Sequence, residues 1–544
     1  MTHTYLTLDS VSCVLPDGRT LFSNLNAQFD QRKTALVGRN GVGKSLLGKI
    51  AAGRLAPSSG SRLCTGTVYY IGQQISLSAS VCVADLAGVK SVIDALQRIE
   101  AGGVEPLDFD KVGERWDIRH RLQLALAQHG LGHLEIDRPA ATLSGGEAMR
   151  VCLIGAYLAQ AEFLILDEPS NHLDYSGRQA LIDQLSAWPG GLLVISHDRA
   201  LLTTMDRLVE LSSLGLRSYG GDLSFYLQCK ALEREQAEAQ LVQAKHQRNR
   251  QELQMLALQT RLERQRARAN KQAGNANQAK ILLGRDKQRS EDTGGKQVKQ
   301  QASHRQQLSQ RVRQAAQQVE DSAAVCMQVP VPSNIHGKRL IELDSLELPC
   351  VAPAARYLSL IINSQQRVAI TGPNGSGKST LLRVLAGLQQ PLAGQYQIQG
   401  AFAYLDQQLL CIDPAKSAIE HLQAANRQLK EGELRTHLAQ LGLDAATVVQ
   451  PCQLLSGGER LKVALACSLY GQKPPQLLML DEPSNHLDFP SMQALEQALR
   501  AYRGALLVVS HDEVFLQQLG LTHRLAVSAC GWALDSWQGV LPRG

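Results

Sequence analysis

The sequence predicts an α/β protein in which two copies of one domain are joined by a basic α-helical hairpin. Four short motifs occur twice, in the same order, in the two halves of the 544-residue chain. Each half alternates short apolar stretches with helix-forming ones, which is typical of a largely parallel sheet covered by helices. A central stretch between the halves is rich in Ala, Leu, Gln, Glu and Arg and holds the positive charge of the chain.

The repeated motifs establish the duplication. The first motif is GRNGVGKS at 38–45 and returns as GPNGSGKS at 372–379, and the second is LSGGE at 143–147 and again at 455–459. The third is FLILDEPSNHLD at 163–174 and returns as LLMLDEPSNHLD at 477–488. The fourth is VISHD at 194–198 and returns as VVSHD at 508–512. Because the motifs follow in the same order in both halves, we expect a first domain at 1–225, a linking segment at 226–329 and a second domain at 330–544. The interval before the second LSGGE is shorter, so we expect a short arm inserted in the first domain near 90–116.

The linking segment reads as two antiparallel helices. Residues 230–268 contain neither Pro nor Gly, and 298–323 are similar, whereas the stretch between them breaks the helical pattern and forms the tip. From Lys230 to Asp321 there are 19 Lys and Arg against 10 Asp and Glu, although the whole chain carries only +6. A flexible linker or a solvated charged spacer is the alternative to a nucleic-acid-binding hairpin.

Each glycine-rich motif follows an apolar strand, TALVG or RVAIT, and precedes a helix. Glycines let main-chain N–H groups turn toward phosphate oxygens, the lysine reaches the outer phosphates, and the serine offers a hydroxyl to Mg²⁺. The predicted nucleotide-binding residues here are Gly38, Arg39, Asn40, Gly41, Val42, Gly43, Lys44 and Ser45, and Gly372, Pro373, Asn374, Gly375, Ser376, Gly377, Lys378, Ser379 and Thr380.

Two carboxylates end each apolar strand of the third motif. Asp167 and Asp481 are placed to hold the Mg²⁺ shell. Glu168 and Glu482, one residue on, are expected to point to the other side of the strand and to orient the attacking water.

LSGGE forms a second anion-binding turn at a helix start. Since each domain already has one phosphate cradle, the second must serve another nucleotide, which predicts a head-to-tail sandwich of the two domains. Ser144, Gly145, Gly146 and Glu147 then cover the ATP held by Lys378, and Ser456, Gly457, Gly458 and Glu459 cover the ATP held by Lys44.

This series of motifs resembles the ATP-binding cassette (ABC) proteins, and PSNHLD in both copies, with the basic hairpin, resembles their ABC-F family. The resemblance covers nearly the whole chain. It implies that Gln73 and Gln407 contact Mg²⁺ and the attacking water, that Asp174 and Asp488 cross the domain interface, and that His197 and His511 contact the γ-phosphate. ABC domains usually stack an aromatic ring on adenine, whereas Leu15 stands where that ring is expected in the first copy.

The resemblance also implies a function. ABC-F proteins work without membrane domains at the ribosomal exit-site region, with the hairpin reaching toward peptidyl-tRNA, and they regulate translation or protect it from antibiotics. The expected contacts with rRNA and tRNA phosphates are Lys271, Lys280, Arg285, Lys287 and Arg289 at the hairpin tip. The arm of the first domain would touch the large ribosomal subunit. We expect ATP and Mg²⁺ as cofactors, and a monomer in which the two domains pair within one chain.

Two other classes of protein share some of these motifs. A transport ATPase with separate membrane subunits would not need a basic hairpin, and a DNA-repair ATPase would carry a longer coiled coil or zinc-binding cysteines. The 11 cysteines form no CxxC pair, which disfavours zinc. No apolar run of about 18 residues and no signal-peptide pattern occur, so we expect a cytoplasmic protein.

Overall fold

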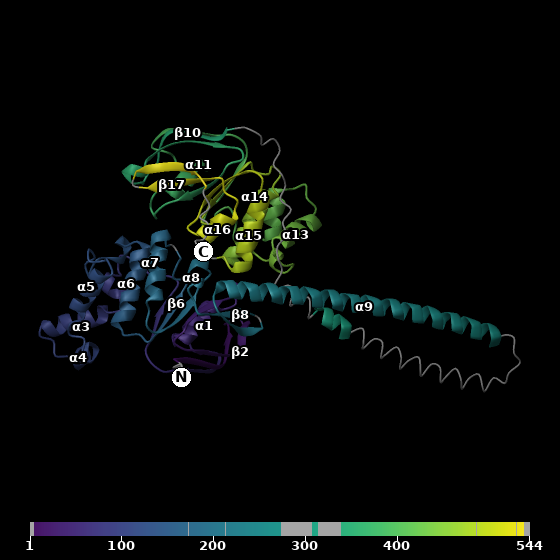
Figure 1. Cartoon of the computed structure of the whole chain (residues 1–544), viewed down its shortest axis with the longest axis horizontal. Helices are drawn as coiled ribbons and strands as arrows, with labels where there is room; N and C mark the ends of the chain where they lie inside the picture. Colours follow the sequence, from purple (N-terminus) through teal and green to yellow (C-terminus); the bar gives the residue numbers. More distant parts are fainter. Residues whose placement is uncertain are drawn as a thin grey trace. The chain divides into compact units, whose positions relative to one another are not determined.

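The computed structural model describes residues 5–171, 173–212, 214–273, 307–313, 339–485, 487–528 and 530–537 (Figure 1). By its internal contacts the chain divides into one unit of Met1–Tyr226 with Ala324–Gly544 and another of Leu227–Ala323. The first unit contains both copies of the repeated domain, called here the first and the second cassette.

The first cassette combines a six-stranded sheet with a smaller antiparallel one. The strand orders are β5-β6-β7-β3-β8-β9, with only β9 antiparallel, and β2-β1-β4. Its elements are β1 Leu6–Val14, β2 Thr20–Phe29, β3 Lys33–Val37, α1 Lys44–Ala51, β4 Ser59–Cys64, β5 Val68–Ile71, α2 Val83–Leu86, α3 Lys90–Glu100, α4 Pro106–Val112, α5 Ile118–Gln128, η1 Ala140–Thr142, α6 Gly145–Leu158, β6 Phe163–Asp167, α7 Tyr175–Ser186, β7 Gly191–Ile195, α8 Arg199–Leu202, β8 Arg207–Ser212 and β9 Gly215–Gly220.

The second cassette repeats this topology. Its strand orders are β14-β15-β16-β12-β17-β18 and β11-β10-β13. Its elements are β10 Arg339–Glu347, η2 Pro353–Ala355, β11 Tyr357–Asn363, β12 Arg367–Thr371, α11 Lys378–Leu385, β13 Ala393–Ile398, β14 Phe402–Leu405, α12 Ala418–Ala425, α13 Glu431–Gln440, η3 Thr447–Val449, η4 Cys452–Leu454, α14 Gly457–Leu469, β15 Leu477–Asp481, α15 Phe489–Ala501, β16 Ala505–Val509, α16 Glu513–Gln518, β17 His523–Ser528 and β18 Gly531–Ser536. The predicted α/β class with two cassettes is confirmed.

The parallel strands are buried on both faces, which explains their unbroken apolar sequences. All five residues of β6 and of β7 are buried, and so are those of β15 and β16. The carboxyl ends of these parallel strands lie at one edge of the sheet. The polar residues of the motifs directly follow the strands at that edge.

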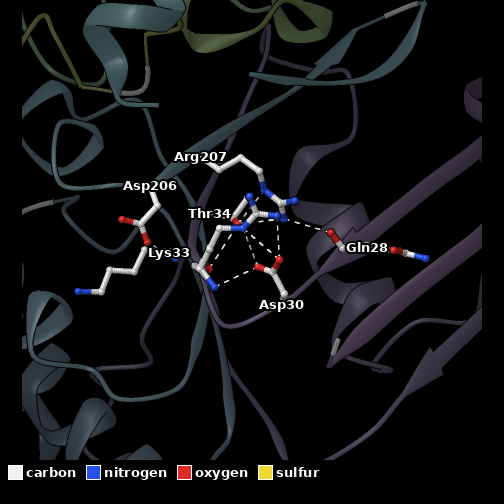
Figure 2. Close-up of polar contacts among 7 residues, drawn as sticks. Gln28, Asp30, Lys33, Thr34, Asp206 and Arg207 are labelled. Atoms are coloured by element: carbon white, nitrogen blue, oxygen red, sulfur yellow. Dashed lines mark hydrogen bonds and ion pairs between the residues drawn. The ribbon is translucent and has the colours of Figure 1, made fainter. Parts of the chain in front are cut away.

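A polar cluster fixes the entry of the chain into the central strand β3, as Figure 2 shows. Arg207 donates to the Gln28 carbonyl and to the Thr34 hydroxyl, each at 3.1 Å. Arg32 donates to the Asp30 carboxylate at 2.8 Å, and this bond holds the pKa of Asp30 below its usual range. The cluster therefore anchors the strand that leads into the first glycine-rich loop.

Two segments extend the cassettes. Residues 90–116 fold as α3 and α4, where Arg98 donates to both oxygens of Asp108 at 2.7 and 2.8 Å. Helix α9, Leu223–Ala273, covers the first helix-forming run of the linking segment, and residues 307–313 of the second run are also helical (Figure 1). Within the described part of the chain, no helix combines the length and apolar character that crossing a membrane requires.

Candidate functional site

Each glycine-rich loop joins a buried central strand to the first turn of a helix. Gly43 and Gly377 cap α1 and α11 with φ of 98° and 96°, a left-handed conformation. A Cβ on Gly43 would lie 2.9 Å from a ring carbon of Phe22, and one on Gly377 would lie 2.8 Å from a methyl of Val351. Both backbone and space therefore require glycine where the loop becomes a helix.

The two loop lysines lie across their own loops. Lys44 Nζ donates to the carbonyl oxygens of Gly38 and Arg39 at 2.7 and 2.9 Å. Lys378 Nζ makes the same contacts to Gly372 and Pro373 at 2.8 and 2.7 Å. Burial lowers the pKa of both ammonium groups, and nearby carboxylates oppose that change. Each ammonium group is therefore buried and held against the carbonyl oxygens of its own glycine-rich loop.

A hydroxyl and a carboxylate meet beside each loop. Ser45 Oγ donates to Asp167 at 3.1 Å, and Ser379 Oγ donates to Asp481 at 3.0 Å. Both aspartates are almost fully buried, which raises their pKa values. An anionic carboxylate beside a hydroxyl is a donor set of the hard oxygens that Mg²⁺ prefers, so these residues fit that ion.

A tyrosine that the sequence motifs did not predict lies at each of these sites. Tyr70 hydroxyl donates to the second oxygen of Asp167 at 3.2 Å, and Tyr404 hydroxyl does so to Asp481 at 3.4 Å. The signal was present, because each tyrosine stands three residues before the predicted glutamine, Gln73 or Gln407. These bonds orient the carboxylates, as outer partners of metal ligands commonly do.

Each glutamate of the third motif faces the histidine of the fourth. Glu168 lies 3.9 Å from His197 Nε2, and Glu482 lies 3.5 Å from His511 Nε2. Burial raises the pKa of Glu482 to about 8 and lowers the pKa of His511 to about 4. Burial shifts the pKa values of Glu168 and His197 in the same directions. In both pairs these shifts favour a carboxylic acid beside a neutral imidazole.

The direction of the glutamates has a different cause from the one predicted. Strands β6 and β15 end at Asp167 and Asp481, so strand alternation does not extend to the next residue. Instead Glu168 and Glu482 adopt left-handed conformations with φ of 49° and 50°. This bend, uncommon for residues with a Cβ, turns the glutamates away from the path of the strand.

Both LSGGE motifs form capping boxes at helix starts. Ser144 Oγ accepts from the Glu147 N–H at 3.2 Å and donates to its carboxylate at 2.8 Å, so α6 begins in a fixed geometry. Ser456 and Glu459 repeat these bonds at the start of α14. The adjacent glycines, Gly145 and Gly146, then Gly457 and Gly458, form the first turns of these helices.

An aspartate from each cassette contacts the glycine-rich loop of the other. Asp488 accepts from the Asn40 N–H at 3.0 Å, and Asp174 accepts from the Asn374 N–H at 3.3 Å. Each aspartate also caps its own helix through its other oxygen, at Ser491 N and Gly177 N respectively. Both glycine-rich loops are therefore completed by a group from the opposite cassette.

The two histidines have different neighbours. His197 packs edge-on against Phe489 of the second cassette, with ring centroids 5.7 Å apart. His511 instead makes a hydrogen bond of 3.1 Å with the Asn374 side chain of its own cassette. Tyr175, the counterpart of Phe489, is 61% exposed, so the two sites are not equivalent.

The remaining predicted residues make none of the contacts described above. Gln73 and Gln407 are exposed, just beyond β5 and β14. Of the loop and first-turn residues, Gly41, Val42, Gly375 and Ser376 lie within the loops and Thr380 lies in α11. Lys271 lies in α9, where only the backbone is described, and Lys280, Arg285, Lys287 and Arg289 lie outside the described residues. Leu15 lies in the turn after β1, and the ring against the first glycine-rich loop is that of Phe22.

Comparison with known proteins agrees with the duplication. A family described as "ABC transporter" matches residues 22–171 and 355–485. Tylosin resistance ATP-binding protein TlrC of Streptomyces fradiae is 31% identical, covering 91% of this chain and 92% of that one. Energy-dependent translational throttle protein EttA of Mycobacterium tuberculosis is 30% identical, and the alignment covers 91% of this chain and 86% of EttA. Ribosome protection protein VmlR of Bacillus subtilis is 29% identical, and the alignment covers 94% of this chain and 85% of VmlR.

A solved structure supports the fold. The similar structure is that of an archaeal ribosome recycling factor, crystallised with a ribosomal stalk protein. The superposition covers 95% of this chain and 87% of the recycling factor, with a TM-score of 0.54 and 19% sequence identity. Because the family match falls in both cassettes and the alignments with TlrC and EttA extend over more than four fifths of both chains, the chain is a tandem ATP-binding-cassette protein of the ABC-F family.

Proposed function

We propose that this protein hydrolyses ATP at two composite sites and uses the cycle to act on the ribosome. The observation that carries the ATPase part is the exchange of aspartates, in which Asp174 and Asp488 each bond to the loop of the opposite cassette. An ATP bound at either loop would therefore be held by both cassettes, and its cleavage would loosen their contact.

Within each site the residues have separate tasks. Lys44 and Lys378 would exchange their loop carbonyl partners for phosphate oxygens. Ser45 with Asp167, and Ser379 with Asp481, would hold Mg²⁺, and Gln73 and Gln407 would complete the two sites. The ion would supply positive charge against the phosphates. The serines and glycines of the LSGGE motifs would cover the nucleotide from the other side.

The glutamates and histidines would carry out the cleavage. Water attacks the γ-phosphorus, the bond to the bridging oxygen breaks, and ADP and phosphate result. Glu168 or Glu482 orients that water and accepts its proton, for which its raised pKa is suited once it has ionised. A neutral His197 or His511 can donate one N–H to the γ-phosphate without requiring protonation.

The ribosome is the partner that the relatives and the charge favour. One relative is named for protecting the ribosome and another for throttling translation. The linking segment carries a net excess of nine positive charges between Lys230 and Asp321, which fits a phosphate-rich surface of rRNA or tRNA. Whether the cellular role is general translation or protection from an antibiotic is tested by comparing drug susceptibility with and without the gene.

The first prediction tests the proposed cycle with Glu168→Gln and Glu482→Gln combined. The amides keep the shape of both sites but accept no proton, so hydrolysis should slow by roughly 10²–10⁴-fold while ATP still binds. If the closed state binds the ribosome and hydrolysis releases it, this protein should co-sediment with ribosomes in ATP and much less in ADP.

Adding Lys44→Ala and Lys378→Ala provides the matched control. These changes remove the phosphate contacts, so ATP-dependent co-sedimentation should disappear. A double-glutamine protein that binds ATP stably yet stays in the supernatant would contradict the ribosomal role, while leaving ATP hydrolysis to be judged by its own assay.

A further inference from the structure

An arginine near the start of α7 reaches from the first cassette to the second. Arg178 Nη1 donates to the main-chain carbonyl of His511 at 3.2 Å. Its Nε lies 3.0 Å from Asp198 Oδ2 in its own cassette, and the two side chains are only 14% and 5% exposed. Burying a guanidinium requires such a partner, so the position of the arginine is fixed from both sides.

The two groups that Arg178 joins belong to equivalent loops of different sites. Asp198 directly follows His197, and its other oxygen caps α8 through the Ala200 N–H at 3.0 Å. His511 is the histidine that faces Glu482. The arginine therefore connects the histidine loop of one ATP site with the histidine loop of the other.

Among the residues that the structure describes, this link has no counterpart in the opposite direction. The residue equivalent to Arg178 is Met492, which is buried in the hydrophobic core of the second cassette. A neighbouring ion pair, Arg199 to Glu496 at 2.8 Å, also starts from an arginine of the first cassette. The residue equivalent to Arg199 is Glu513, which pairs with Arg524 of its own cassette at 3.0 Å.

We propose that Arg178 is a positioning residue that couples the two ATP sites in one direction. It holds the His511 loop in its working geometry only when the first-cassette loop at Asp198 is itself in place. Hydrolysis at the Lys378–Glu482 site then depends on the histidine loop of the first cassette, whereas no arginine among the described residues of the second cassette makes the reverse link to the Lys44–Glu168 site. This inference rests on the proposed ATPase function and deepens it.

The test measures each site alone, without ribosomes. Glu168→Gln leaves only the second-cassette site able to hydrolyse, and Glu482→Gln leaves only the first. Arg178→Met, which copies the residue at 492, should lower kcat about tenfold in the Glu168→Gln protein, the effect of losing one hydrogen bond from a charged group. KM for ATP should change little. In the Glu482→Gln protein, kcat should stay within about twofold, since Arg178 makes no contact with Glu168 or His197 in the described structure.

Two further variants separate positioning from a general structural role. Arg178→Lys keeps the charge but not the planar fork, so it should recover part of the lost kcat. Met492→Leu changes the equivalent position conservatively and should alter neither single-site protein. Equal losses of kcat in both single-site proteins, or a rise in KM alone, would overturn the proposal.

Amide hydrogen exchange gives a readout that does not depend on turnover. Arg178→Met should speed exchange in 510–513 of the ATP-bound protein, whereas the α8 cap at 198–201 keeps its own bonds and should stay protected. Unchanged exchange in 510–513 would refute the coupling even if the glutamates proved not to be the catalytic groups. Single-site proteins that retain full ATPase activity would instead refute the catalytic roles, and the exchange result would then decide the coupling alone.

Discussion

Glu482 and Glu168 are buried acids whose pKa values are raised in the folded protein. A carboxyl group with a raised folded-state pKa adds stability below its unfolded pKa, and loses that contribution as pH rises through the folded value. For Glu482 the window runs from about 4.5, its ordinary value, to about 8. In nucleotide-free protein the wild-type sites therefore become less stable across this range.

The second prediction follows from this loss of stability with rising pH. Replacing both glutamates with Gln removes the ionisation, so the variant should gain Tm relative to wild type as pH rises from 5 to 8. We expect the difference to grow by a few degrees, roughly the effect of 1–3 kcal/mol on a protein of this size. Calorimetry without nucleotide checks it. A constant difference across this range would show that the acids are not held neutral.

Among the site residues, those within a continuous motif could be predicted and those joined by folding could not. Lys44, Ser45 and Asp167 stand beside glycines or at the end of an apolar strand, where local chemistry identifies them. Tyr70 and Arg178 instead form hydrogen bonds with residues 97 and 333 positions away. Their sequence neighbours do not encode those partners.

Among the secondary-structure elements, the central strands could be predicted from short apolar runs in the sequence. The expected RVAIT strand coincides with β12, and TALVG differs from β3 by one residue at each end. The helix expected after the first glycine-rich motif is α1, which begins directly after Gly43 without a polar side chain as its cap. The small sheet of β2, β1 and β4 was not predicted, since its strands alternate in burial and pair across a bulged register.

The third prediction concerns the hairpin tip. Changing Lys271, Lys280, Arg285, Lys287 and Arg289 to Gln removes five positive charges. If these side chains neutralise RNA phosphates, ribosome binding should weaken and its dependence on salt should flatten, since fewer counterions are released. Titrations of binding at several salt concentrations measure the slope, and basal ATPase activity should stay nearly the same.

A matched control uses basic residues outside the tip. Changing Arg234, Lys245, Arg248, Arg250 and Arg261 on α9 to Gln removes the same charge from another part of the segment. An equal flattening in both proteins would mean that the tip has no special contact, and that the segment acts by overall charge.

For the whole molecule, the link between cassettes is partly ionic. Arg199 and Glu496 form a contact of 2.8 Å with side chains only 13% and 12% exposed. Removing one member of a partly buried ion pair lowers the stability of the fold more than removing both members does, because the remaining charge then has no partner.

The fourth prediction is a charge exchange across this contact. Arg199→Glu should place two acids together and lower stability by about 1–3 kcal/mol. Adding Glu496→Arg should restore much of the loss, as measured by thermal unfolding. If the double variant is as unstable as the sum of the single ones, the two residues do not interact across the cassettes.

The left-handed backbone at Glu168 and Glu482 has a consequence for how such a protein changes over generations. An L-residue held in this conformation costs about 1 kcal/mol more than glycine would, and glutamate becomes glycine by a single nucleotide change. That mutation would relax the bend and remove the buried acid together. A lineage that no longer needed the proposed hydrolysis would therefore gain stability by this one change.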